Sequence, residues 1–80
     1  MTYAYRVNAK YDYEEIEIQT NSAERAIKFM LDSAEDWAIV TVTNGFTGEV
    51  LAAINYDEFY ATEEWSLMML GWMMKTAEEF

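Results

Sequence analysis

The stretch TYAYRVNAKYDY, residues 2–13, alternates between two kinds of side chain. Odd-numbered positions from Tyr3 to Tyr13 are aromatic or aliphatic, and even-numbered positions from Arg6 to Asp12 are polar. Successive side chains of a strand point to opposite faces of a sheet. The period of two therefore predicts a strand with one buried face.

A second strand is predicted directly after the first. Residues 15–20 alternate again, with Ile16 and Ile18 on the buried side and glutamates on the other. The join at residues 12–14 is short, so the two strands are expected to form a β-hairpin.

An amphipathic helix is predicted to follow this hairpin. Asn21 or Ser22 can cap its first turn, and Glu24 stands three residues after Asn21, as in a capping box. Phe29 falls off the apolar face and is expected at solvent or at a partner. The apolar face recurs at three- and four-residue steps and comprises Ala23, Ala26, Ile27, Met30, Leu31 and Ala34.

A second hairpin is predicted from residues 37–43 and 49–56, joined by NGFTG with Gly48 at positive φ. Aligning Thr43 with Glu49 places Val40, Val42, Ala52 and Ile54 on one face. The reverse face is also partly apolar, so the hairpin is expected to be covered on both sides. That reverse face carries Trp37, Ile39, Thr41, Leu51 and Ala53.

Residues 57–80 are predicted to form a last helix that begins at Asp57. Its apolar surface is wider than one face, which leaves two interpretations open. It completes the core, with Met filling irregular gaps, or it is a self-association surface. One helical stripe holds Trp65, Met68, Met69, Trp72, Met73 and Phe80, of which the first five are the candidate self-association residues.

The predicted order of elements is ββαββα, an α+β fold with an antiparallel sheet of two hairpins and two helices. Eighty residues make one domain, residues 1–80, and a domain this small has a thin margin of stability. The chain has no Cys, so disulfides cannot supply the missing stability. Oligomerisation, in the simplest case a homodimer, is the remedy left open.

The residue types that carry most catalysis are missing. There is no His and no Cys, and Lys28 belongs to a solvated helix face. No phosphate-binding or zinc motif is present, and the acids match no metal-binding spacing. We therefore expect no enzyme activity, no catalytic residue, no cofactor and no metal.

The charge of the chain is lopsided, with 15 acidic and 5 basic residues and a formal net charge of −10. Such a surface repels nucleic acid and anionic membranes and attracts basic protein surfaces. The apolar run 67–74 is shorter than the roughly 20 residues that cross a bilayer, and no signal peptide is evident. We expect a cytoplasmic protein that contacts neither membrane nor nucleic acid directly.

Two interpretations of the acidic residues are open. They keep a small protein soluble, or they form one acidic edge whose carboxylates replace phosphates in a basic groove. Arg6 and Lys10 are able to neutralise acids across the first hairpin, which weakens the second interpretation there. The favoured contacts are Glu14, Glu15, Glu17, Asp57, Glu58, Glu63 and Glu64.

Small size, strong acidity, the missing Cys and His, and the α+β hairpin order together resemble the small inhibitors of phages and mobile elements, of which anti-CRISPR proteins are the best known. The resemblance spans the whole chain but is one of composition, without a shared motif. It implies a stoichiometric, non-enzymatic inhibitor of a host defence complex. The implied partner is a basic nucleic-acid-binding protein such as a CRISPR effector in the host cytoplasm, bound by nucleic-acid mimicry.

The alternative function is a small homodimeric adaptor or interaction module. It uses the apolar C-terminal helix for binding, and its acidity serves solubility alone.

Overall fold

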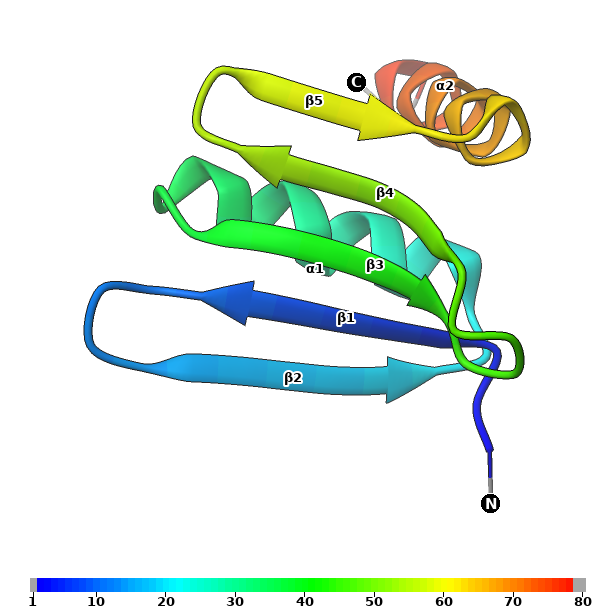
Figure 1. Cartoon of the computed structure of the whole chain (residues 1–80). Helices are drawn as coiled ribbons and strands as arrows, with labels where there is room; N and C mark the ends of the chain where they lie inside the picture. The colour runs from blue at the N-terminus through cyan, green and yellow to red at the C-terminus, as the bar shows by residue number, and fades with distance from the viewer. Residues whose placement is uncertain (1, 79–80) are drawn as a thin grey trace.

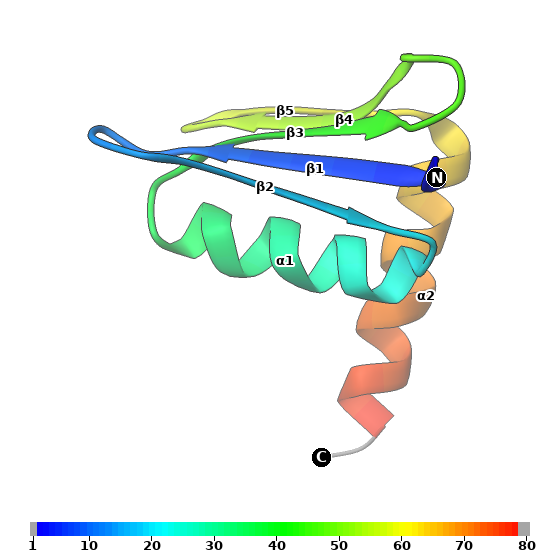
Figure 2. The ribbon, with the colours of Figure 1, turned by 90° about the horizontal axis from the view of Figure 1, so that it is seen from below.

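Five antiparallel strands form one sheet with both helices on the same side, in a computed structural model that describes residues 2–78 (Figures 1 and 2). The strand order is β2-β1-β3-β4-β5. The α+β class is thereby confirmed. The elements are β1 (Tyr5–Lys10), β2 (Glu15–Thr20), α1 (Ala23–Glu35), β3 (Ile39–Asn44), β4 (Val50–Asn55), β5 (Glu58–Ala61) and α2 (Glu63–Glu78).

The alternation that predicts β1 is confirmed by its register. Val7 pairs with Ile18 of β2 on one side and with Val42 of β3 on the other. Directly opposite residues share a face of the sheet. Val7 and Val42 are fully buried in the core, where they face α1.

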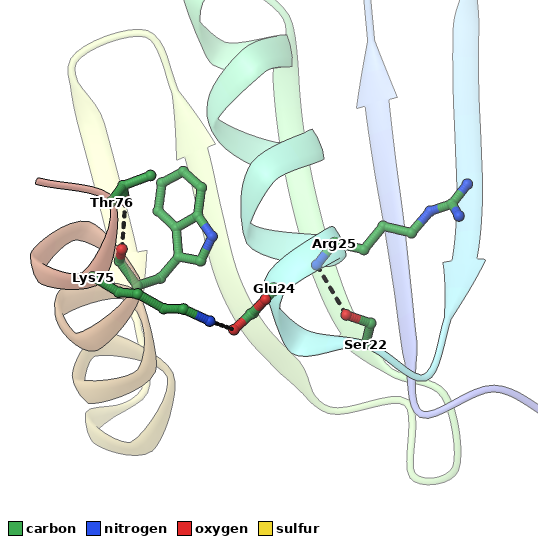
Figure 3. Close-up of polar contacts among 6 residues, drawn as sticks. Ser22, Glu24, Arg25, Lys75 and Thr76 are labelled. Carbon is green, nitrogen blue, oxygen red and sulfur yellow. Dashed lines mark hydrogen bonds and ion pairs between the residues drawn. The ribbon is translucent and has the colours of Figure 1, made fainter. Parts of the chain in front are cut away.

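Helix α1 is capped by Ser22, the second of the two predicted cap residues. The predicted capping box of Asn21 and Glu24 is wrong, because the Asn21 side-chain oxygen accepts a hydrogen bond from the Ala4 amide. The amide of Arg25 donates a hydrogen bond of 3.2 Å to the Ser22 hydroxyl oxygen (Figure 3). Ile27 and Met30 are buried against the sheet. The expectation for Phe29 is met only in part, because this residue is partly exposed and also packs against the core.

The second hairpin differs from its predicted alignment by one residue at Thr43 and by two residues from Val42 to Val40. Thr43 pairs with Val50 instead of Glu49, and the register shifts at Val42 and Thr43, as at a β-bulge. A one-residue shift moves a side chain to the other face of a sheet. Leu51, expected on the reverse face, therefore packs against the core, whereas Gly48 has the predicted positive φ, 78°.

The prediction that residues 57–62 are helical is wrong, because the chain makes a fifth strand there. Phe59 and Tyr60 favour a strand, and Ala61 pairs with Ala52 of β4. The helix begins after Thr62, whose hydroxyl oxygen accepts a hydrogen bond of 3.2 Å from the Trp65 amide. That is the bond an N-cap residue makes.

Helix α2 starts at the end of β5 and runs away from the sheet, across the start of α1 (Figure 2). The Trp65 ring is fully buried and lies 5.4 Å from the Tyr5 ring, centroid to centroid. Near the other end of α2, the Lys75 ammonium contacts the Glu24 carboxylate of α1 at 3.1 Å (Figure 3). Phe80, placed in the apolar stripe by its spacing, lies outside the described residues.

The second face of the sheet is open. Both helices within residues 2–78 lie on one side of it (Figure 2), so the expectation that the β3–β4 hairpin is covered on both sides is wrong. No helix of this part of the chain is both long and apolar enough to cross a membrane.

We expect Trp65→Ala to lower the free energy of unfolding by about 3–5 kcal/mol, because it empties a fully buried aromatic site. Trp72→Ala is the matched control, since Trp72 is only partly buried on the same helix. Urea denaturation followed by circular dichroism measures both. A smaller loss for Trp65→Ala than for Trp72→Ala contradicts the packing described.

Candidate functional site

Three chain connections meet at one end of the sheet (Figures 1 and 2): the β1–β2 turn, the α1–β3 connection and the β4–β5 turn. Each carries acidic and aromatic side chains that are far apart in the sequence. We call this region the acidic–aromatic end. It comprises Tyr11, Asp12, Tyr13, Glu14, Glu35, Asp36, Trp37, Tyr56 and Asp57.

The α1–β3 connection is a helix-ending turn with an unusual residue in it. The Trp37 amide donates to the Ala34 carbonyl and the Ala38 amide to the Ser33 carbonyl, both at 3.1 Å. These are the two bonds of a Schellman motif, which places a left-handed residue, usually Gly, just after the helix. Here that residue is Trp37, with φ of 64° and its side chain 73% exposed. A bulky residue in this conformation is strained.

The last turn of α1 carries charges of the unfavourable sign. Glu35 and Asp36 stand at its C-terminal end, and no basic residue lies in the last turn. The end of a helix is the negative pole of its dipole, so carboxylates there are destabilising. The same few residues thus depart from two local rules of helix stability.

The β4–β5 turn repeats the pattern seen at Trp37. Asn55 pairs with Glu58, which leaves Tyr56 and Asp57 as a two-residue turn. The first of these, Tyr56, has φ of 54° and is exposed, although such turns favour Gly, Asn or Asp at positive φ. Within residues 2–78, the non-glycine residues at positive φ are Trp37 and Tyr56, both exposed aromatics at the same end.

Trp37 joins the three connections into one strip. On one side it lines a hollow of about 200 Å³ with Tyr56 and Ile54. On the other side it lines an open hollow of about 360 Å³, whose remaining walls are Tyr11, Asp12, Tyr13, Glu14 and Asp36. Aromatic faces attract ammonium and guanidinium groups, and carboxylates pair with the same groups. Both hollows therefore suit Lys or Arg side chains of a partner.

The predicted acidic edge is divided by the fold. Glu14 and Asp57 lie in the acidic–aromatic end, and Glu58 follows as the first residue of β5. Glu63 and Glu64 lie in the first turn of α2, at the opposite end of the sheet (Figure 1). The expectation of a single contiguous edge is therefore wrong, because β2 and β5 are the two outer strands, separated by four strand spacings or roughly 19 Å.

The two glutamates predicted on β2 have polar neighbours. The Asn8 side-chain amide donates a hydrogen bond of 2.7 Å to Glu15, and Arg6 stands 3.9 Å from the Glu17 carboxylate. Lys10 pairs with Glu15 in the strand register. The neutralisation expected across this hairpin is thus present for Glu17, whereas Glu15 accepts a hydrogen bond from a neutral amide and keeps its charge.

The candidate self-association residues are mostly turned inward. Trp65 and Met69 are buried, and Met68 and Trp72 pack against the core. Of the five, Met73 is more than half exposed. Trp65, Met68, Met69 and Trp72 thus pack within the monomer. The prediction that these four residues form a self-association surface is therefore wrong.

Sequence reasoning identifies Tyr11, Tyr13 and Tyr56 as aromatic anchors among the acids but misses Trp37. The pattern predicts Trp37 in a strand and Tyr56 at the end of the next one, whereas both occupy turns. One signal was available: the amphipathic pattern ends near residue 35 and no Gly follows it. A helix that ends without Gly or Asn at the next turn places some other residue in the left-handed position.

Comparisons with known proteins give no match: no family model fits the chain, and neither the curated proteins nor the solved structures include a similar one. Within residues 2–78, no group of three or more acidic residues is arranged to hold a metal ion.

We expect Trp37→Gly to raise the free energy of unfolding by about 0.5–1 kcal/mol, because Gly adopts the left-handed conformation without strain. Phe46→Gly is the matched control, since Phe46 is similarly exposed, at 67%, and does not have positive φ. Thermal denaturation compares the two variants. A clear loss of stability in Trp37→Gly contradicts the account of strain at this turn.

Proposed function

We propose that this protein is a non-enzymatic inhibitor that binds a basic, nucleic-acid-binding surface of a host defence complex through its acidic–aromatic end. The protein occupies the place of nucleic acid on that surface. The partner is of the CRISPR effector type that the composition suggests, and the site of action is the host cytoplasm.

The observation that carries the proposal is the coincidence of strain and exposure at Trp37 and Tyr56. Local departures from stable geometry are expected where function requires them. Two bulky aromatic residues in strained turns add little to the core, since both are exposed. Exposed Trp and Tyr are instead the residue types that dominate the energy of protein interfaces.

The charge around these aromatics supports a basic partner. No Lys or Arg occurs between Lys28 and Lys75, the stretch that supplies Asp36, Trp37, Tyr56 and Asp57. In the described residues, the two ion pairs are Arg6–Glu17 and Lys75–Glu24, and neither involves an acid of this end. The carboxylates here are therefore available to a partner's Lys and Arg side chains.

Competition with DNA tests the proposal. The probe is fluorescently labelled target DNA bound to purified guide-loaded CRISPR nuclease complexes of several types, followed by anisotropy. We expect the protein to displace DNA from at least one complex, and to do so less well at high salt because surface charges are screened. Displacement from none of the complexes contradicts the proposal.

A charge-reversal pair locates the contact. We expect Asp12→Lys with Asp36→Lys to weaken the displacement of DNA about tenfold or more, because both acids rim the larger hollow. The matched control is Glu49→Lys with Glu64→Lys, which changes the net charge equally at the opposite end of the sheet. Equal losses in both variants contradict a specific role for the acidic–aromatic end and leave only general charge attraction.

A further inference from the structure

Helix α2 has a second apolar face in addition to the one that packs on the core. Leu67 is 63% exposed and Leu70 54% exposed, and Met73 and Met74 are similarly exposed. Leu67, Leu70 and Met74 follow one another at three- and four-residue steps, so they form one stripe along the helix. The monomer does not use this stripe, because the opposite face of α2 carries Trp65 and Met69 into the core.

Gly71 lies beside this stripe, on the side of α2 that faces α1. It lines a groove between the two helices with Glu24, Trp72 and Lys75, and an added Cβ there meets nothing within 4 Å. Glycine in a helix interior is destabilising relative to Ala, and packing within the monomer does not require it here. Gly71 therefore offers a control position outside the apolar stripe.

The charges that border the stripe indicate the kind of partner. Glu63, Glu64 and Glu78 stand at its two ends and are exposed. Lys75 is turned toward α1, where it contacts Glu24 (Figure 3). A second copy of this chain, with a net charge of −10, brings like charges against these acids. A helix with Lys and Arg beside its apolar stripe complements both the apolar surface and the acids.

We propose that the outer face of α2, formed by Leu67, Leu70 and Met74, is the docking surface for a basic amphipathic helix of a partner protein. Flexible Met side chains adapt to the shape of such a helix. The surface lies away from the acidic–aromatic end, since α2 leaves the sheet at its other end (Figures 1 and 2). The inference therefore does not rest on the proposed function.

The test uses the full chain and a labelled synthetic peptide of about 14 residues, built from Leu and Lys at the helical period. Anisotropy is expected to show binding to the wild type. Leu67→Ser with Leu70→Ser is expected to weaken binding about tenfold or more, because two apolar contacts are lost. Gly71→Ala is expected to raise the thermal midpoint of the monomer and to leave binding unchanged, because Gly71 faces α1 and not the stripe. Circular dichroism checks that each variant keeps its fold.

Two controls separate this face from general charge and hydrophobicity. Phe46→Ser removes an equally exposed apolar side chain elsewhere and is expected to leave affinity unchanged. A peptide with Glu in place of Lys is expected not to bind. Equal binding by the wild type and the double Ser variant overturns the proposal. So does a concentration-dependent dimer, or binding to zwitterionic lipid vesicles, that the same variant abolishes, because each assigns the face to another occupant.

Discussion

The packing of α1 across β1 and β3 is the contact on which the rest of this molecule depends. Val7, Val42 and Ile27 meet in it and are almost completely removed from water. The helix has 13 residues and is about 20 Å long, and strands of six residues span about the same distance. The helix therefore ends where the strands turn, and its last residues arrive beside the β1–β2 turn.

That match of lengths brings the candidate site together. The acids and aromatics of residues 11–14, 35–37 and 56–57 are scattered along the chain, and the fold brings all three segments to one end of the sheet (Figure 1). Residues 36 and 37 lie between the other two segments. The burial of a few apolar side chains in the core stabilises the fold by more than the strain at Trp37 and Tyr56 destabilises it. Apolar side chains also remain exposed on the open face of the sheet and on the outer face of α2, so the core does not bury all of them.

The sequence predicts those elements whose signals are local. The alternation of side chains predicts β1 and β2, Ser22 predicts the start of α1, and Gly48 predicts the turn of the second hairpin. The prediction failed where two local signals compete. Asp57 resembles a helix start, yet Thr62 is the residue that caps α2, and the strand between them has only four residues.

The candidate site was only half predictable for a different reason. The number of acidic residues can be read from the sequence. Which of them lie close together depends on the strand order, which places β2 and β5 at opposite edges of the sheet. The predicted contacts therefore include Glu14 and Asp57 without Trp37, and they include Glu63 and Glu64 although these lie at the far end. The bulge in β4 shifts Leu51 by one position, and no residue in the sequence marks that shift.

Nuclear magnetic resonance mapping with an arginine-rich peptide tests most directly whether the acidic–aromatic end receives cationic side chains. With the protein labelled with nitrogen-15, we expect the largest shifts at the Trp37 indole and at the amides of Tyr13, Asp36 and Asp57. Shifts spread evenly over all exposed acids, or centred on Glu63 and Glu64, would contradict a binding site at this end of the sheet.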